Sequence, residues 1–313
     1  MAFELKINES VPQGIRRIVR KEIDKSLDAL TAHVDGSRIE AVHDARRRFK
    51  KIRAALKLVR EELGPEVYPR ENACFRDAGR PLTEVRDAQV LVETLDKLAA
   101  HYAAEVTRES LEEARRELLA HERAICKRVL DEENAQAVVA VILQASRPRV
   151  KDWVIEHDGW AALRNGLKSV YRRGRKAFAA AASEPSVEHL HEWRKRVKDL
   201  WHQLQIIEPM HQSLAQEAIQ AHELADALGD DHDLAVLRDF LTEIPGMAAQ
   251  PAMVATLLGL IARRRAELQQ AADLLGRRIF ASKPKEFVAR LHDLWRVWRT
   301  DGEASEREKP SPL

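Results

Sequence analysis

The sequence predicts an all-α protein. Its 313 residues include 45% hydrophobic and 33% charged residues but only 5% aromatic ones, and Gly and Pro number 12 each. The abundant Ala, Leu, Arg and Glu favour helices, and Gly and Pro are too few for the many tight turns of a hairpin-rich fold. Apolar residues three and four positions apart recur along the chain, which is the pattern of helices with one buried stripe.

The expected helices fall into two series, one in each half of the chain. In the first half they lie near residues 12–34, 38–63, 66–101, 103–131 and 134–146, and in the second near 158–182, 187–208, 211–243, 251–278 and 284–299. Ser37 with Glu40 forms a capping box ahead of the helix at 38–63, and Ser186 is placed to cap the helix at 187–208. Gly64-Pro65 and Glu208-Pro209 end these two helices.

The two halves repeat one pattern. Residues 42–50 (VHDARRRFK) match residues 190–198 (LHEWRKRVK) at an offset of 148, which places His43 on His191. At this offset the apolar positions 42, 45, 49, 52, 56 and 59 fall on 190, 193, 197, 200, 204 and 207. We therefore predict two tandem four-helix bundles, residues 1–150 and 151–300, that together form one domain, followed by a disordered tail at 301–313.

Overall charge does not indicate a partner, because 52 Lys and Arg nearly balance 50 Asp and Glu. A polyanion site must then come from local segregation of charge. Cys74 and Cys126 form no CxxC motif, so we expect a reducing compartment and no Cys-based zinc site. The N-terminus has no apolar segment of signal-peptide length, and no apolar run reaches the roughly 20 residues that span a bilayer. We expect a cytoplasmic protein without a membrane partner.

Positive charge gathers on one face of two equivalent helices. Residues 43–60 carry eight Lys or Arg and a single acid, Asp44. Like charges at helical spacing disfavour a helix, so a basic face that occurs twice in register is better explained by a bound anion. Arg grips phosphate oxygens with a planar fork, and Lys supplies a mobile charge. The predicted polyanion contacts are His43, Arg46, Arg47, Lys50 and Lys57 in the first half and His191, Arg194, Lys195, Lys198 and His202 in the second.

Two further basic clusters lie on the helices that precede these two. They comprise Arg16, Arg17, Arg20 and Lys21 in the first half, and Arg172 and Arg173 with their basic neighbours in the second. If the two bundles face each other, four basic helices line one concave surface that spans a long anion. We therefore include both clusters among the predicted contacts, on the basis of charge.

These motifs resemble the CHAD family, the conserved-histidine α-helical domain. The segments that carry the resemblance are VHDARRRFKKIR at 42–53, EVRDAQVL at 84–91, LHEWRKRVKDLWHQL at 190–204 and ALGDDHDLAVL at 227–237, and it extends over roughly residues 10–300. The resemblance implies two four-helix bundles related by pseudo-twofold symmetry, with a central basic cavity that binds inorganic polyphosphate, and some members associate with polyphosphate granules. It places polyphosphate contacts at His43, Arg46, Arg47, Lys50, His191, Arg194, Lys195 and Lys198.

The chain departs from an even repeat in two places. Asp199 and Trp201 stand where the first half has Lys51 and Arg53, so the second basic face is weaker. His232-Asp233 replaces Arg86-Asp87, and we expect Asp87 and Asp233 to cap or pair locally.

We expect a non-catalytic protein that needs neither a cofactor nor a metal, since the sequence has no P-loop, HExxH or GxSxG motif. One alternative is a nucleic-acid-binding helical protein, because any such basic face also binds RNA weakly, although the two faces hold few side chains suited to base stacking or base reading. A metal-dependent phosphohydrolase built on the acids at 230–233 is a second alternative. A scaffold that docks an acidic protein is a third.

Overall fold

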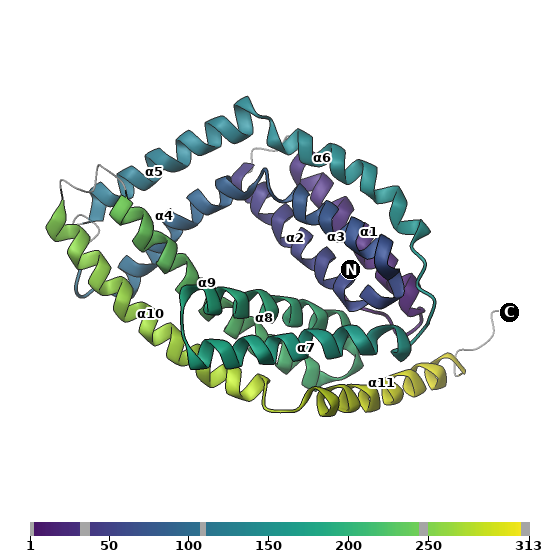
Figure 1. Ribbon diagram of the computed structural model, residues 1–313. Coiled ribbons are helices and arrows are strands. Elements are labelled where there is room, and N and C mark those ends of the chain that lie inside the picture. The colour runs from purple at the N-terminus through teal and green to yellow at the C-terminus, as the bar shows by residue number, and fades with distance from the viewer. Residues whose placement is uncertain (1–2, 32–37, 107–110, 244–249, 308–313) are drawn as a thin grey trace.

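The computed structural model describes residues 3–31, 38–106, 111–243 and 250–307, and over these ranges it is all-α, which confirms the predicted fold class (Figure 1). The helices are α1 (Val11–Thr31), α2 (Arg38–Leu58), α3 (Arg60–Ala78), α4 (Thr83–His101), α5 (Glu112–Cys126), α6 (Ala135–Ser146), α7 (Trp160–Ser183), α8 (Val187–Ile207), α9 (Gln212–Glu243), α10 (Pro251–Ile279) and α11 (Pro284–Arg307). Short helical turns of other types follow α5, α6 and α8.

The helix predicted at 66–101 is two helices, α3 and α4. The chain leaves the helical path between Ala78 and Thr83, where Pro81 has no N–H to donate and its ring hinders a continuing helix. A second irregularity lies at Gly64, whose positive φ of 70° kinks α3 directly before Pro65. In the second half no proline interrupts the corresponding segment, and α9 runs unbroken from Gln212 to Glu243.

The ends of several elements test the predicted boundaries. Ser186 caps α8, accepting a hydrogen bond from the backbone N–H of His189 at 3.2 Å, as predicted. The other predicted cap, Ser37, lies outside the described residues. Helix α11 continues to Arg307, well into the segment at 301–313 for which we predicted disorder, and residues 308–313 lie outside the described ranges.

Two clusters of buried apolar side chains hold the helices together. The larger cluster joins α1, α2, α3 and α6 to α7, α8, α11 and the first part of α9. The smaller one packs α4 and α5 against the second part of α9 and against α10. Each cluster takes residues from both halves of the chain, so the halves share their interior instead of enclosing one core each. The helices form an elongated ring in which α2 and α8 lie on the inner side (Figure 1).

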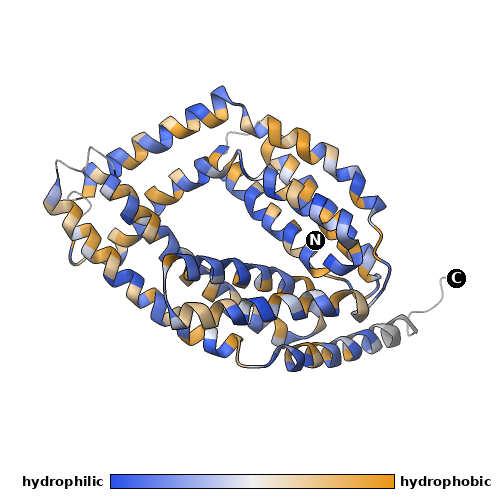
Figure 2. Cartoon of the chain, in the orientation of Figure 1, coloured by the Kyte–Doolittle hydropathy of each residue, from blue (hydrophilic) through white to orange (hydrophobic). Residues whose placement is uncertain are grey.

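Helices α2 and α8 place the basic faces at the centre of the molecule. Their apolar stripes point into the larger cluster, where Phe49 and Trp193 are buried. Long hydrophilic stretches remain on both helices (Figure 2). Helix α7 packs tightly at the end of α2, because a Cβ at Gly166 would lie only 1.9 Å from the Leu58 carbonyl oxygen. No helix in the described ranges has the length and apolar character to cross a membrane.

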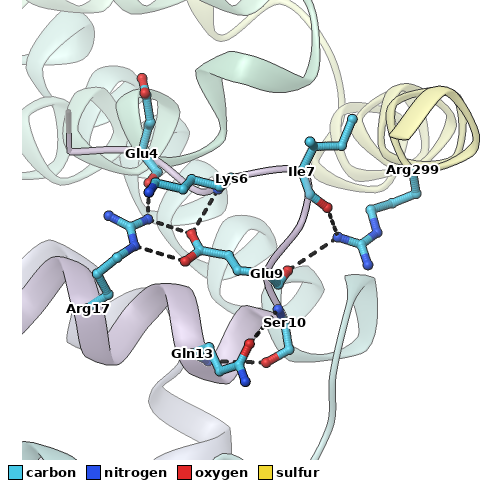
Figure 3. Close-up of polar contacts among 8 residues, drawn as sticks. All are labelled: Glu4, Lys6, Ile7, Glu9, Ser10, Gln13, Arg17 and Arg299. Carbon is cyan, nitrogen blue, oxygen red and sulfur yellow. Dashed lines mark hydrogen bonds and ion pairs between the residues drawn. The ribbon is translucent and has the colours of Figure 1, made fainter. Parts of the chain in front are cut away.

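The N-terminal segment before α1 contacts three helices, and Figure 3 shows its contacts with Arg17 of α1 and Arg299 of α11. The backbone N–H of Leu5 donates to the Ile206 carbonyl oxygen at the end of α8, at 2.8 Å. Arg17 of α1 donates from Nε to a carboxylate oxygen of Glu9 at 2.8 Å. Arg299 of α11 donates to the carbonyl oxygen of Ile7 at 2.7 Å. These contacts fix the segment, whose Phe3 and Leu5 side chains belong to the larger cluster.

Candidate functional site

A cavity of about 890 Å³ lies between α2, α4, α8 and α9. Ten of the predicted polyanion contacts line it, and they are all those expected on the two basic faces: His43, Arg46, Arg47, Lys50, Lys57, His191, Arg194, Lys195, Lys198 and His202. Because residues three and four apart lie on one side of a helix, a single face of α2 and a single face of α8 supply this whole set. The two halves of the repeat thus meet across one space.

The cavity is strongly basic. Ten Lys or Arg side chains line it against four Asp, an excess of six formal positive charges when the five histidines are neutral. Four of the ten also form ion pairs with acids outside the lining: Arg47 with Asp44, Arg86 with Glu93, and both Lys195 and Arg196 with Glu192. This excess exists within a molecule whose overall formal charge is only +2. A concave site lined by one sign of charge focuses its potential and concentrates counter-ions of the opposite sign.

On the α2 side, Arg46 is held in a fixed position. Its Nη1 donates to the carbonyl oxygen of Gly79 at 2.5 Å and to the hydroxyl of Thr83 at 2.6 Å, which joins α2 to the start of α4. Its Nε is buried and has no acceptor among the described residues. Arg46 therefore keeps one donor unused within the wall of the cavity.

The α8 side repeats this arrangement with different partners. Arg194 approaches Asp233 of α9 at 3.9 Å, and its Nε also lacks an acceptor within the described part of the chain. The imidazole rings of His191 and His232 lie 4.4 Å apart, and the buried Nδ1 atom of each ring is unpaired there too. Burial and neighbouring positive groups lower the pKa of both histidines to about 4, so both rings are neutral at neutral pH.

Lys50 and Lys198 extend into the cavity from opposite walls. Removal from bulk water and then the charge of Lys198 lower the pKa of Lys50 to about 7, and removal from bulk water and then Arg194 lower the pKa of Lys198 to about 8. Lys50 keeps an exposed surface, so its low pKa comes from partial removal from water and from positive neighbours, and not from a sealed interior. An anion between the two ammonium groups relieves this repulsion.

Two of the lining residues are engaged with the protein itself. Lys57 donates to both carboxylate oxygens of Asp199, at 2.5 and 2.6 Å, so its charge is neutralised by α8. His202 is buried, its Nδ1 lies 3.0 Å from Oε1 of Gln205, and burial lowers its pKa to about 3. Both residues line the wall, while the excess of positive charge comes from their neighbours.

The basic cluster on α1 is not part of this cavity, so the predicted common surface of four basic helices is wrong. Arg16 donates to the Trp153 carbonyl oxygen at 2.7 Å, and Arg17 pairs with Glu9. Neither these two nor Arg20 and Lys21 line the cavity, because α1 packs its apolar side on α2 and turns its arginines toward other segments. Arg172 and Arg173 of α7 line a separate, smaller cavity.

The structure adds residues that the sequence analysis did not assign to the site. Arg53, Arg86 and Arg196 contribute positive charge, and Asp87, Asp233 and His232 come from α4 and α9. The repeat could have identified some of these residues from the sequence, because it aligns Arg86-Asp87 with His232-Asp233. We expected both aspartates to cap or pair locally. Both line the cavity, Asp233 lies 3.9 Å from Arg194, and burial raises the pKa of each carboxyl.

The acids at 230–233 do not form one group. They lie inside α9, not at a helix N-terminus, and each has its own basic partner. Asp230 pairs with Lys97 at 3.1 Å, and Asp231 pairs with Arg265 at 3.0 Å. The described residues contain no group of three or more His, Cys, Asp or Glu side chains placed to hold a metal ion.

The family model of the CHAD domain matches residues 18–242. The chain belongs to the CHAD family. A solved structure, that of the CHAD domain from the plant Ricinus communis, is similar to this CHAD protein, with 16% sequence identity and a TM-score of 0.60 over 88% of this chain and 95% of the plant chain. At this identity the likeness shows the fold alone. Among curated proteins, none matches the chain significantly.

Proposed function

We propose that this CHAD protein binds inorganic polyphosphate, without acting on it as an enzyme, in the cavity between α2, α4, α8 and α9. The observation that carries the proposal is the excess of six positive charges on the walls of one 890 Å³ cavity. The unpaired Nε donors of Arg46 and Arg194 add to it, since buried polar groups are nearly always hydrogen-bonded and a bound anion is one partner that these donors could have.

The distribution of these groups suits a chain of phosphates better than a single one. Arg46 and Lys50 lie on one wall, and Arg194 and Lys198 lie on the other, so successive phosphates meet guanidinium and ammonium groups from both halves. Each contact of this kind is charge-assisted. Several such contacts along one polymer raise affinity with chain length through effective concentration, and added salt weakens them.

The test is calorimetric titration with long-chain polyphosphate and with single-stranded RNA at matched phosphate concentration and physiological salt. We expect tight binding of polyphosphate and weak binding of RNA. Stronger binding of RNA would move the protein to the nucleic-acid-binding class, and binding of neither would favour a scaffold that docks an acidic protein.

Charge reversal assigns the binding to the cavity. In the double variant Lys50→Glu with Lys198→Glu, we expect polyphosphate affinity to fall about a hundredfold or more, because two charge-assisted contacts become repulsive. The matched control reverses Lys151 and Lys285, which are exposed and lie outside the cavity, and we expect it to bind nearly as the parent does. A folded cavity variant with unchanged affinity would show that this site is not where polyphosphate binds.

The proposed ligand also predicts where the protein is found. We expect it in the cytoplasm, at polyphosphate granules in cells that form them. A fluorescent fusion that stays diffuse in granule-containing cells would contradict the association with granules.

A further inference from the structure

A second cavity, of about 250 Å³, is lined by residues of α2, α3, α7 and α8. It shares Lys57 and Asp199 with the large cavity, so the ion pair between these two side chains forms part of the partition between them. Gly166 also lines it, at the point where α7 approaches the end of α2 so closely that a side chain would not fit. The small cavity is therefore built into the packing of the central helices.

The side chains around this cavity leave positive charge unmatched. Arg60, Arg172 and Arg173 line it, and none of the three forms an ion pair with any described residue. Two carboxylates also line it, of which Asp199 is neutralised by Lys57. The other, on Glu61, accepts a hydrogen bond from Asn165 at 2.6 Å. The four basic and two acidic groups leave an excess of two positive charges.

The helix that supplies two of these arginines carries no acid of its own. Helix α7 has the sequence WAALRNGLKSVYRRGRKAFAAAAS, so nothing within the helix offsets its basic residues. Arg172 and Arg173 are exposed and keep their guanidinium groups available. A guanidinium is well suited to grip the oxygens of a phosphate.

Gln203, which lines the small cavity, carries an acceptor that lacks a donor among the described residues. Gln203 is fully buried, and its Nε2 donates to the Ala54 carbonyl oxygen at 3.2 Å, which fixes the orientation of the amide. Its Oε1 is buried and receives no hydrogen bond from the described residues. A buried acceptor without a donor is costly, so a ligand that brings an O–H to this position is favoured. The cavity thus offers cationic donors and one neutral acceptor together.

We propose that the small cavity binds a phosphate group that carries a P–OH, as free orthophosphate does and as the end group of a polyphosphate chain does. Its charged oxygens accept hydrogen bonds from Arg172, Arg173 and Arg60, and its hydroxyl donates to Oε1 of Gln203. A phosphate inside a chain has two bridging oxygens and no hydroxyl, so it satisfies the arginines but not Gln203. The part of the proposal that concerns chain ends rests on the proposed function; the phosphate site itself does not.

The test compares two ligands of equal charge. At pH 5, below the second pKa of about 6 of a phosphate monoester, methyl phosphate and dimethyl phosphate each carry one negative charge, and only methyl phosphate has a P–OH. Titrations use the Lys50→Gln, Lys198→Gln variant, which weakens the large cavity. Binding is read from glutamine side-chain ¹⁵N resonances, with the Gln203 signal identified by its loss in Gln203→Met.

We expect methyl phosphate to shift the Gln203 signal saturably and to bind about fivefold or more tightly than dimethyl phosphate, the value of one added hydrogen bond. Adding Arg172→Gln and Arg173→Gln should abolish this binding. The matched control changes Arg175 and Lys176, which are exposed on the same helix but outside the cavity, and should leave it intact. Equal affinity for the two esters, or no saturable shift, overturns the proposal.

Two further titrations distinguish the sources of the phosphate. Esterifying both end groups of a short polyphosphate should weaken its effect on the Gln203 signal if chain ends occupy the cavity; an unchanged effect overturns the chain-end part. Saturable binding of orthophosphate at Gln203 supports the site even if polyphosphate binds nowhere, which would refute only the proposed function. A third outcome is that the Lys50, Lys198 variant loses polyphosphate binding and phosphate has no effect on the Gln203 signal. That outcome would refute this site and leave the proposed function standing.

Discussion

Proton uptake should accompany polyphosphate binding. The pKa values of Lys50 and Lys198, about 7 and about 8, are low because both ammonium groups are largely removed from bulk water and lie among other positive groups. A polyanion favours the charged form of each lysine and raises both pKa values toward their usual range near 10.4. The free protein is therefore less protonated than the complex at neutral and alkaline pH, and binding takes protons from the buffer.

The size of the effect follows from the two pKa values. At pH 7.5, about a quarter of Lys50 and about three quarters of Lys198 are protonated in the free protein, so full protonation in the complex takes up about one proton. The uptake is about 0.1 proton at pH 6 and about 1.7 at pH 8.5. Affinity should thus be flat near pH 6 and fall about tenfold per pH unit near pH 7.5. Water in the cavity screens part of the repulsion, so these values are upper bounds.

The assay is calorimetric titration at pH 7.5 in two buffers with different ionisation enthalpies. The observed binding enthalpy should differ between the buffers by about one ionisation enthalpy, since each proton taken up comes from the buffer. Lys50→Arg keeps the charge but does not titrate, so it should remove about three quarters of this difference, whereas Lys195→Arg should not change it. An enthalpy that is the same in both buffers would refute the coupling between these lysines and the anion.

Three further predictions concern the packing around the site. Trp193→Ala should lower the free energy of unfolding by about 3–5 kcal/mol in denaturant titrations, because a buried ring leaves a void, and a change near zero would mean that Trp193 is not a core residue. Gly166→Ala should lower the free energy of unfolding by about 3 kcal/mol, because the added Cβ clashes with α2. The control Gly259→Ala adds a Cβ that meets nothing within 4 Å, so it should be neutral or stabilising. Equal effects of the two variants would contradict the close approach of α7. Asp199→Asn should lower the free energy of unfolding by about 3 kcal/mol, because it leaves Lys57 unpaired. The same variant should bind polyphosphate more tightly, because the charge of Lys57 is no longer neutralised. Weaker binding by the folded variant would argue against a purely electrostatic site.

The sequence allowed the helices and the walls of the cavity to be predicted because both depend on spacing along one helix. His43, Arg46 and Lys50 share a face of α2 whatever packs around it, and the repeat transfers that face to α8. The family resemblance added that the two faces enclose a common cavity. In the structure, all ten of the residues predicted on these faces do line one cavity.

The sequence did not allow the ion-pair partner of each charged residue to be predicted. Arg17, like Arg46, has several basic neighbours along its helix, but its partner, Glu9, comes from the segment before α1, which has no periodic pattern. Likewise the sequence does not show that Asp199 reaches Lys57 on the other half of the chain, or that Asp233 reaches Arg194. These pairings depend on the relative placement of helices, which spacing within one helix does not determine.

The shared interior of the two halves has a consequence for the repeat unit itself. Because α4 and α5 bury their apolar side chains against α9 and α10, a single half would expose much of that surface to water. A lone half could recover this burial by pairing with a second copy of itself. Because both halves belong to one chain, this burial is an internal event and needs no encounter between molecules, and each half can carry its own residues, as Asp199 opposite Lys57 illustrates.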